Sequence, residues 1–419
     1  MDNKKKYRIM LAFVLIVDII LLFSLLYVKV QKKIPERLYL YEKESQDFDF
    51  SLPMKASLQQ GSATVICDQT KRVENNIAFD FGEPFSLYSQ EKGSCSISVK
   101  FLGFIPVKQI SVNVIEKKQV HVGGETIGIK IDTNGILVLG TGAITGKDGQ
   151  QHEPAKNIIQ SGDYIYKINH TEISTKEDLS SQLKQINQKK VIITVKRGEE
   201  FLDLSINAVD TEDGYKLGIW VRDDTQGIGT LTYYNDDGNF AALGHGISDI
   251  DTGTTMNVKD GYICNAGIYQ IVKGSKGKPG EISGYLKKDD ENRLGTISKN
   301  SKYGIRGTLY ENTNFETETL NIGLKQEIKK GNAEILCQVN GQVERYQIKI
   351  EKININEKEK GLVLHVVDSK LLNITGGIIQ GMSGSPIIQN GKLIGAVTHV
   401  FVNDPTRGYG IFIENMLES

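Results

Sequence analysis

The sequence predicts a mainly β fold whose carboxy-terminal half is built from closed barrels. Glycine accounts for 43 of the 419 residues, and short runs of valine, isoleucine and threonine are bounded by Gly, Asn and Asp. This pattern is typical of strands joined by tight turns. Between Asp213 and Ser419 such runs recur at short intervals, and few stretches have a helical period. A long series of short strands suits one closed β barrel or two barrels packed together.

Composition and charge exclude several classes of function. The chain has 50 Lys and Arg against 51 Asp and Glu, so no strong field attracts nucleic acid, and we expect no nucleic-acid partner. Its four cysteines form no C-x-x-C pair and have no His at metal-ligand spacing, so we expect neither a metal nor a cofactor. Cys67 and Cys95 lie in one β-rich segment, where they form either a disulfide or a pair of small buried residues.

Residues 9–28 form the one long apolar run, and a helix of this length spans roughly 30 Å, about one bilayer core. Asp18 opposes insertion by about 3 kcal/mol, whereas the fifteen Leu, Ile, Val and Phe residues favour it by about 4 to 9 kcal/mol. Residues 27–30 offer no small-x-small cleavage site, which favours an uncleaved anchor over a signal peptide. Residues 1–8 then form a cytoplasmic tail, although equal numbers of basic residues on the two sides leave the orientation open.

A linker and a small β-rich region follow over residues 29–118, and residues 119–210 have the pattern of a compact α/β unit. In that unit, Thr175 and Asp178 supply a capping box for a helix with Leu179, Leu183 and Ile186 on one face. The strand that follows alternates Val191, Ile193 and Val195, which predicts a helix packed on a small sheet.

The order of elements in residues 119–210 resembles a PDZ domain. Ile127, Gly128 and Ile129 match the hydrophobic-Gly-hydrophobic carboxylate loop, and the run GDYIYKINHTEIS matches the usual G-D-x-I-x-x-I-N-G, with His170 in place of the last Gly. The resemblance implies that the N–H groups of residues 127–129 bind a peptide end while a sheet edge adds the peptide as a strand.

The run QGMSGSPIIQNGKLIGAVTH, which begins at Gln380, has the features of a serine nucleophile site. A serine hydroxyl needs a neighbouring base, usually an oriented His, and the oxyanion formed on attack needs nearby N–H donors. Gly381 allows close backbone approach, Gly384 permits a bend, and Pro386 interrupts regular pairing. We expect Ser383 to be the nucleophile and the N–H groups of Gly381 and Ser383 to form the oxyanion hole.

Three motifs together resemble the SpoIVB peptidase family of endospore-forming bacteria. They are FAALGHGISD around His245, LHVVDSKLL around Asp368, and TGGIIQGMSGSPIIQNGKLIGAVTHVFVNDP around Ser383. The resemblance implies that His245 is the base and Asp368 the acid that orients it. It also implies a chymotrypsin-like double β-barrel serine peptidase domain over residues 211–419, preceded by the PDZ domain and the membrane anchor over residues 9–28.

Several alternatives remain open at the level of sequence. Ser385 competes with Ser383 but lacks the Gly381 spacing. His365 and His399 compete with His245; His365 is expected to face away from Asp368, and His399 to line the substrate cleft. Asp249 or Asp251 could replace Asp368 as the orienting acid.

The family resemblance further implies sporulation signalling. The body would be exported from the forespore into the space between the forespore and mother-cell membranes, and the enzyme would cleave itself. It would then cut a membrane-bound regulator so that a sigma factor precursor is processed. A hypothesis of another class is a noncatalytic adaptor that binds partners through the PDZ unit.

Overall fold

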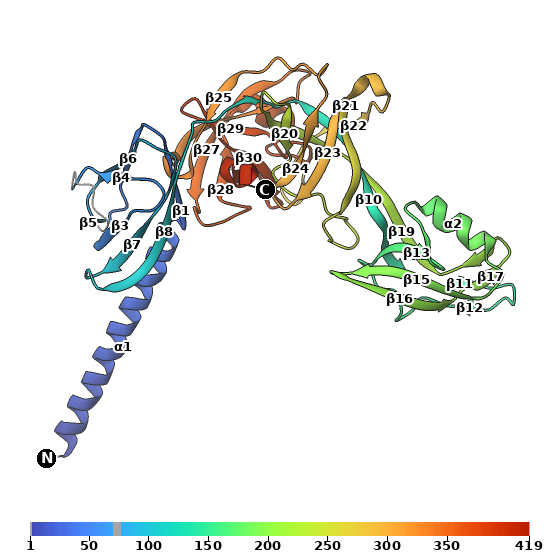
Figure 1. Ribbon diagram of the computed structural model, residues 1–419, viewed down its shortest axis with the longest axis horizontal. Coiled ribbons are helices and arrows are strands. Elements are labelled where there is room, and N and C mark those ends of the chain that lie inside the picture. The colour runs from blue at the N-terminus through green and yellow to red at the C-terminus, as the bar shows by residue number, and fades with distance from the viewer. Residues whose placement is uncertain (1, 70–76, 419) are drawn as a thin grey trace. The chain divides into compact units, whose positions relative to one another are not determined.

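The computed structural model describes residues 2–69 and 77–418, and strands dominate it alongside one long amino-terminal helix (Figure 1). The mainly β class is therefore confirmed. The chain divides into two compact units. The first comprises residues 1–119, 321–330 and 352–362, and the second comprises residues 120–320, 331–351 and 363–419.

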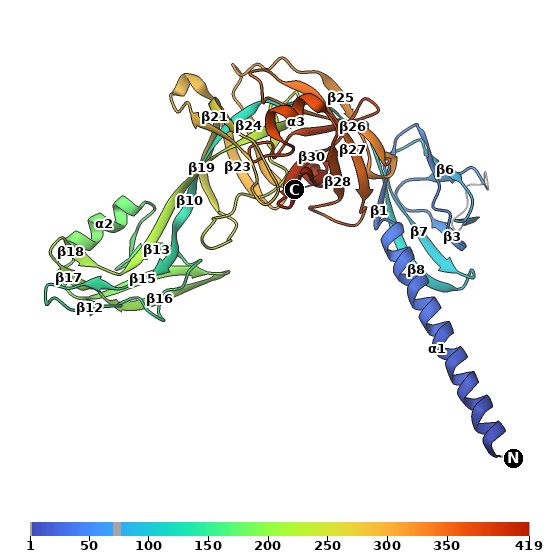
Figure 2. The ribbon, with the colours of Figure 1, turned by 180° about the vertical axis from the view of Figure 1, so that it is seen from behind.

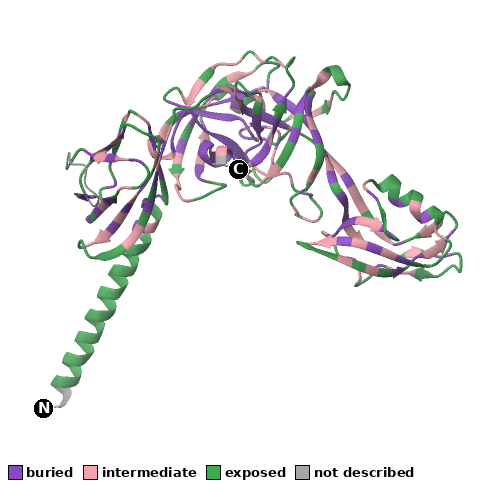
Figure 3. Ribbon diagram, viewed as in Figure 1, coloured by how far each residue is buried: buried purple, intermediate pink, exposed green. Residues whose placement is uncertain are grey.

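Helix α1 (Asp2–Lys33) is exposed along most of its length and is long and apolar enough to cross a membrane (Figure 3). Its last turn is different, because Val30 is fully buried in the core of the first unit, as is Ile34 just beyond the helix. The ammonium of Lys33 donates to the carbonyl of Phe50, and Lys108 Nζ donates to the carbonyl of Ile34 at 2.7 Å. The carboxyl end of α1 is thus fixed to the β structure that follows it.

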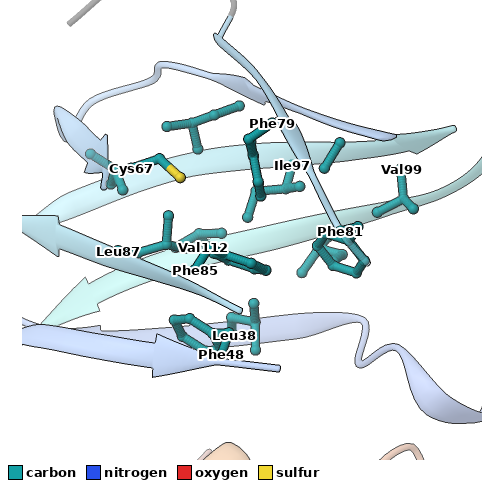
Figure 4. Close-up of a cluster of buried hydrophobic side chains, with 14 of the residues drawn as sticks. Leu38, Phe48, Cys67, Phe79, Phe81, Phe85, Leu87, Ile97, Val99 and Val112 are labelled. Carbon is teal, nitrogen blue, oxygen red and sulfur yellow. The ribbon is translucent and has the colours of Figure 1, made fainter. Parts of the chain in front are cut away.

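Two sheets enclose the core of the first unit. A five-stranded sheet has the order β1-β8-β7-β3-β5, and a three-stranded sheet has the order β2-β6-β4. The strands are β1 (Arg37–Tyr41), β2 (Ser45–Phe48), β3 (Met54–Gln59), β4 (Val65–Cys67), β5 (Ile77–Asp80), β6 (Phe85–Ser89), β7 (Gly93–Phe101) and β8 (Ile105–Ile115). Phenylalanine rings from both sheets meet inside, and Phe50 and Phe81 stack with centroids 4.5 Å apart. Figure 4 shows Phe48, Phe81 and Phe85 in this cluster.

Cys67 and Cys95 are buried in the same core (Figure 4 labels Cys67). Burial raises the pKa of Cys67 to about 11 and that of Cys95 to about 12, so both thiols stay protonated at neutral pH. Their arrangement agrees with the interpretation as small buried residues rather than with a disulfide.

The second unit is organised around two long strands, β10 (Thr126–Thr141) and β19 (Ile219–Tyr234), which pair antiparallel over most of their lengths (Figure 2). One end of this pair belongs to an α/β module and the other end to the barrel region. The module contains β11 (Ile144–Thr145), β12 (Gln151–His152), β13 (Tyr164–Ile168), β14 (Thr171–Glu172), α2 (Lys176–Gln185), β15 (Lys190–Arg197), β16 (Glu200–Asn207), β17 (Val209–Thr211) and β18 (Gly214–Lys216).

Helix α2 confirms the predicted helix in this module, except that Ile186 is extended and lies just beyond its end. Thr175 is the N-cap, and its side chain and that of Asp178 form the reciprocal capping box. Leu179 and Leu183 are buried, and they pack in one core with the alternating residues of β15, including Val191. The helix therefore covers one face of a small sheet, as the sequence periodicity predicts.

The barrel region lies mostly in the second unit and comprises the strand just before β10 and the elements that follow β19. Its elements are β9 (Gln119–Val122), β20 (Asn239–Ala242), β21 (Val258–Val272), β22 (Glu281–Leu286), η1 (Asp290–Asn292), β23 (Arg293–Ser301), β24 (Gly304–Leu309), β25 (Thr319–Ile322), η2 (Lys325–Glu327), β26 (Gly331–Cys337), β27 (Glu344–Ile353), β28 (Leu362–Val366), α3 (Ser369–Thr375), β29 (Pro386–Gln389), β30 (Lys392–Phe401), β31 (Asp404–Phe412) and α4 (Ile413–Glu418), of which η2 and the ends of several strands belong to the first unit. One core packs inside β10, β19, β20, β21, β23 and β24. The predicted division into two barrels and a PDZ domain, and the predicted domain boundaries, stay predictions.

Glu125, between β9 and β10, carries a testable electrostatic feature. Its main-chain carbonyl accepts from Leu231 N at 3.0 Å, but among the described residues its Oε2 has no hydrogen-bond partner. Burial raises the pKa of Glu125 from 4.5 to about 7. The folded protein therefore keeps the Glu125 carboxyl group protonated at pH values where the same group in the unfolded chain has lost its proton.

We expect the stability contributed by protonated Glu125 to be fully present below about pH 4.5 and to be lost as pH rises through about 7. Urea unfolding at a series of pH values should show the wild type losing stability relative to Glu125→Gln across this window. The exposed Glu291→Gln is the control and should follow the wild type. Parallel curves for wild type and Glu125→Gln would contradict the assignment.

Candidate active site

The segment that carries Ser383 is held at both ends by regular structure. Helix α3 ends at Thr375 and is capped by Gly376, which has a left-handed φ of 75°, and β29 begins at Pro386. The buried hydroxyl of Thr375 donates to the carbonyl of Leu371 at 2.9 Å and lies 2.5 Å from the carbonyl of Gly377. The chain therefore leaves α3 in a fixed direction before it reaches the serine.

Two glycines shape the turn around Ser383, as the sequence pattern predicts. Gly381 and Gly384 both have φ of 98°, a conformation that favours glycine. A Cβ at Gly384 would lie 2.0 Å from the carbonyl oxygen of Thr230 and 2.6 Å from the nitrogen of Leu243. Only a residue without a side chain fits at this position.

Strand β19 holds the carbonyl groups of this turn. Thr230 Oγ1 donates to the carbonyl of Gly381 at 2.8 Å, and Thr230 N donates to the carbonyl of Ser383 at 2.9 Å. Thr232 Oγ1 donates to the carbonyl of Gly384 at 2.8 Å. Because three carbonyls point toward β19, the orientation of the intervening peptide groups is fixed.

The N–H groups of the turn divide into two sets. Those of Met382, Gly384 and Ser385 donate to main-chain carbonyls. Those of Gly381 and Ser383 donate to no acceptor within residues 2–69 and 77–418. Unpaired main-chain donors are uncommon in folded proteins, so these two are available to a ligand.

Ser383 lines a cleft of about 570 Å³, whereas Ser385 is completely buried. The Ser383 hydroxyl donates to the carbonyl of Thr398 at 2.7 Å. A hydroxyl has a single proton, so this bond directs the proton away from any imidazole acceptor. Of the two serines, Ser383 alone is accessible from the cleft.

His245 lines the same cleft as Ser383. It follows β20 and two residues with left-handed backbone, Leu243 with φ of 72° and Gly244 with φ of 70°. Its Nδ1 lies 2.9 Å from the carbonyl of Gly246. Donation from Nδ1–H to that carbonyl leaves Nε2 as the proton acceptor of the neutral ring.

His399 also lines the cleft, as predicted, and its ring centroid lies 4.9 Å from that of His245. These two histidines are the only titratable side chains among the described residues that line the cleft. The other lining side chains are small, polar and uncharged, or aliphatic: Ile129, Thr225, Gln226, Gly227, Ile228, Leu243, Gly246, Ile247, Ser248, Pro279, Ile378, Ile379, Gln380, Gly381, Thr398, Val400 and Val402. The cleft suits an uncharged chain segment.

The competing residues have other contacts. His365 Nδ1 lies 3.1 Å from Glu351 Oε1, and His365 does not line the cleft. Asp249 is buried and accepts from Arg222, whose guanidinium also contacts Asp251 at 3.0 Å. None of these groups lies among the residues that surround Ser383.

The structure does not bring Asp368 to the cleft. Asp368 is the N-cap of α3, and its Oδ1 accepts from Leu371 N at 3.0 Å. Its Oδ2 accepts from Gln347 N at 3.2 Å. In this arrangement the carboxylate stabilises the start of the helix that leads to Ser383, and its predicted role at His245 stays a prediction.

The predicted carboxylate loop needs correction. Ile127, Gly128 and Ile129 lie inside β10, which pairs with β19 on one side and with β21 on the other. Ile127 and Ile129 are buried in the barrel core. Residues within a strand that is paired on both sides do not offer the free N–H groups that a peptide end requires. The hydrophobic alternation that resembles a PDZ loop reflects barrel packing instead.

Sequence reasoning missed Thr230 and Thr232. They are 1% and 0% exposed and stand two positions apart, so their hydroxyls point to the same face of β19. The TLT pattern within an apolar strand was the available signal, because buried hydroxyls require partners. Which partners they have depends on a segment about 150 positions later, with separations of 151 and 152 residues.

We expect Asp368→Ala to lower the free energy of unfolding by about 1 kcal/mol, because it removes a helix N-cap. Asp368→Ser should recover most of this loss, since serine is also a favoured N-cap. Urea titrations measure both effects. Equal stability of wild type and Asp368→Ala would contradict the capping role, and the reactivity of the capped Asp368→Ser variant tests whether the carboxylate also serves His245.

Thr230→Val should reduce the rate at which Ser383 reacts with a fluorophosphonate by up to about 10²-fold, because it releases the carbonyl of Gly381 and lets the turn between the two N–H donors move. Its unfolding free energy should fall by only about 1 kcal/mol. Thr230→Ser keeps the hydroxyl and serves as the matched control. An equal loss of rate in Thr230→Ser, which keeps the hydroxyl, would count against this positioning role.

No curated protein matches the chain. Among solved structures, the inactive form of the Rv3671c protease is similar over 46% of this chain and 81% of that chain, with 11% identity and a TM-score of 0.26. A similarity this low supports no inference about function. Residues 213–417 match the family model for SpoIVB peptidase S55 and include Ser383 and His245. This carboxy-terminal half of the chain therefore belongs to the SpoIVB peptidase family.

Proposed function

We propose that this chain is a membrane-tethered serine endopeptidase that uses Ser383 as nucleophile and His245 as general base. The observation that carries the proposal is the meeting of four groups at one turn and cleft. The Ser383 hydroxyl and the His245 imidazole line the cleft, and the unpaired N–H groups of Gly381 and Ser383 flank the nucleophile. Membership of a peptidase family supports the same reaction class.

In the proposed first step, rotation of the Ser383 side chain frees its hydroxyl from the carbonyl of Thr398. His245 Nε2 then accepts the proton as Oγ attacks a peptide carbonyl. The Gly246 carbonyl supports this step because its contact with Nδ1 selects the neutral tautomer in which Nε2 carries no proton. Hydrogen bonds between catalytic groups are often incomplete before substrate binds, so the present orientation of Ser383 is compatible with this role.

The oxyanion formed by attack would be bound by the N–H groups of Gly381 and Ser383. The peptide groups that carry these two N–H donors are held before substrate arrives, because the carbonyl of Gln380 accepts from Ile282 N at 2.8 Å and that of Met382 accepts from Ser385 N at 3.0 Å. Preorganised donors of this kind contribute about 2.7 to 4 kcal/mol each to transition-state stabilisation in serine peptidases. The protonated His245 then gives its proton to the leaving amine, and water completes hydrolysis of the acyl-enzyme.

The family resemblance assigns the role of triad acid to Asp368, but both of its carboxylate oxygens bind main-chain N–H groups near α3. Service at His245 would require this segment to move. In the present arrangement, the Gly246 carbonyl is the acceptor at Nδ1.

The cellular part of the proposal rests on α1 and on the family. Helix α1 meets the length and composition of a membrane span, which supports a single-pass anchor. The family resemblance supports self-cleavage, cleavage of a membrane-bound sporulation regulator, and a location between forespore and mother-cell membranes. The α/β module resembles a PDZ domain in its helix and strand order, so we propose that it captures protein segments at a surface other than residues 127–129.

Ser383→Ala should abolish labelling of the purified full-length protein by a fluorophosphonate and lower peptide-bond cleavage by about a millionfold, because the nucleophile is removed. Ser385→Ala is the matched control, since its hydroxyl is completely buried and has no hydrogen-bond partner among the described residues. It should keep both activities. Mass spectrometry of the fragments from wild type and Ser383→Ala would report self-cleavage sites in the same experiment.

Labelling that survives in Ser383→Ala would overturn the assignment of the nucleophile. Well-folded wild-type protein that is neither labelled nor active would favour the noncatalytic adaptor. Circular dichroism of each variant separates these outcomes from simple misfolding.

A further inference from the structure

We propose that the tip of the β7–β8 hairpin, residues 101–105, is inserted into the same bilayer that α1 spans, as a second membrane contact of the first unit. This inference rests on the membrane anchor in the proposed function. It concerns a surface that lies outside the catalytic cleft and outside α1 itself.

The tip is apolar and exposed. Leu102 is 63% exposed and Phe104 is 70% exposed, and Ile105 beside them is 40% exposed. Their neighbours in β7 and β8 have a different pattern, in which alternate residues such as Ile97 and Ile110 are buried in the core. An exposed apolar cluster confined to the end of a hairpin indicates a contact that the isolated molecule does not satisfy.

The backbone of the tip strengthens this interpretation. Leu102 has a φ of 52° and Gly103 a φ of 83°, and Phe104 N donates to the carbonyl of Phe101 at 3.3 Å. Residues with positive φ in tight hairpin turns are usually Gly, Asn or Asp. A leucine in this conformation is strained, whereas an asparagine would adopt it with little strain and would interact favourably with water. The turn therefore carries an apolar side chain where local chemistry favours a polar one.

The position of the tip beside α1 identifies the membrane as its partner. Phe101, at the end of β7, packs edge-on against Phe23 of α1 with ring centroids 5.3 Å apart. Figures 1 and 2 both show the hairpin running beside α1 toward its amino end. Phe23 lies five residues inside the apolar run that ends at Val28, which is about 8 Å along the helix axis.

This depth matches an interfacial insertion. Apolar groups of membrane-surface elements reach roughly 5 to 10 Å into the boundary between headgroups and acyl chains. The hairpin is fixed at this level, because Gln31 Nε2 donates to the carbonyl of Val107 at 3.3 Å and Lys108 Nζ donates to the carbonyl of Ile34. If α1 spans the bilayer, residues 102–105 lie at the level of its outer acyl chains.

Hydrogen bonding within the hairpin makes this insertion feasible. Open sheet edges do not occur in hydrocarbon. At the tip, β7 pairs with β8 between Phe101 and Ile105, and β7 pairs with β3 between Phe101 and Met54. The edge of β8 nearest the tip lies against α1, which contacts it at Val107. Few main-chain groups would therefore lose hydrogen bonds to water.

Depth-dependent quenching of tryptophan tests the proposal in the full-length protein. The chain has a single Trp, so Trp220→Phe provides a background in which one Trp is placed at Phe104, at Phe23 or at Phe201. Phe201 is 61% exposed and lies in the α/β module, which makes it a matched control. Each variant is reconstituted in phosphatidylcholine and phosphatidylglycerol vesicles, with or without lipids brominated near the headgroup end of the acyl chains.

We expect Phe104→Trp to lose nearly as much fluorescence to brominated lipid as Phe23→Trp, while Phe201→Trp stays unquenched. Quenching of Phe23→Trp alone would overturn the insertion of the tip and leave the anchor intact. Absence of quenching at both positions would overturn the tip and the anchor together. Emission from Phe104→Trp that is unquenched but depends on protein-to-lipid ratio would assign the tip to a second copy of the chain, which also overturns the proposal. Fluorophosphonate labelling of the same samples reports the serine nucleophile independently.

Discussion

The close approach of Gly384 to β19 is the constraint on which the site depends. At this contact the chain has no room for a Cβ, since one would lie 2.0 Å from the carbonyl of Thr230. The same contact brings the turn next to Leu243, two residues before His245. One van der Waals contact therefore sets the relative positions of the nucleophile segment and of the segment that carries the base. A residue with a side chain at position 384 would push the segment that carries Ser383 away from the segment that carries His245.

The same packing also determines which polar groups face the cleft. Thr230 and Thr232 bind carbonyls of the turn, and the main-chain N–H groups of Gly381 and Ser383 have no acceptor among the described residues. Two histidines are the titratable side chains of the described lining, and the rest of it is uncharged. In such surroundings N–H dipoles interact more strongly with a developing negative charge than they would in water.

Strands β10 and β19 join the site to the α/β module. Ile129 of β10 and residues 225–228 of β19 line the cleft, and the far parts of the same strands pair within the module. A strand that contributes to two cores must satisfy the packing of both. This explains why residues 127–129 resemble a PDZ carboxylate loop in sequence but lie inside a strand that is paired on both sides. The first unit is organised differently. Its aromatic core fixes both the end of α1 and the apolar hairpin that lies beside it.

The sequence by itself determined the local elements and the chemical types of the site residues. The capping box at Thr175, the alternation in β15 and the apolar run of α1 are properties of neighbouring residues, so periodicity revealed them. The glycine spacing around Ser383 likewise indicated the tight turn that is present. Only the tertiary structure decided which partners these residues meet. It buried Ser385, placed Asp368 at a helix cap, and brought Thr230 to Gly381. Such contacts join positions far apart in the chain, and their formation depends on the packing of whole sheets, which no local pattern encodes.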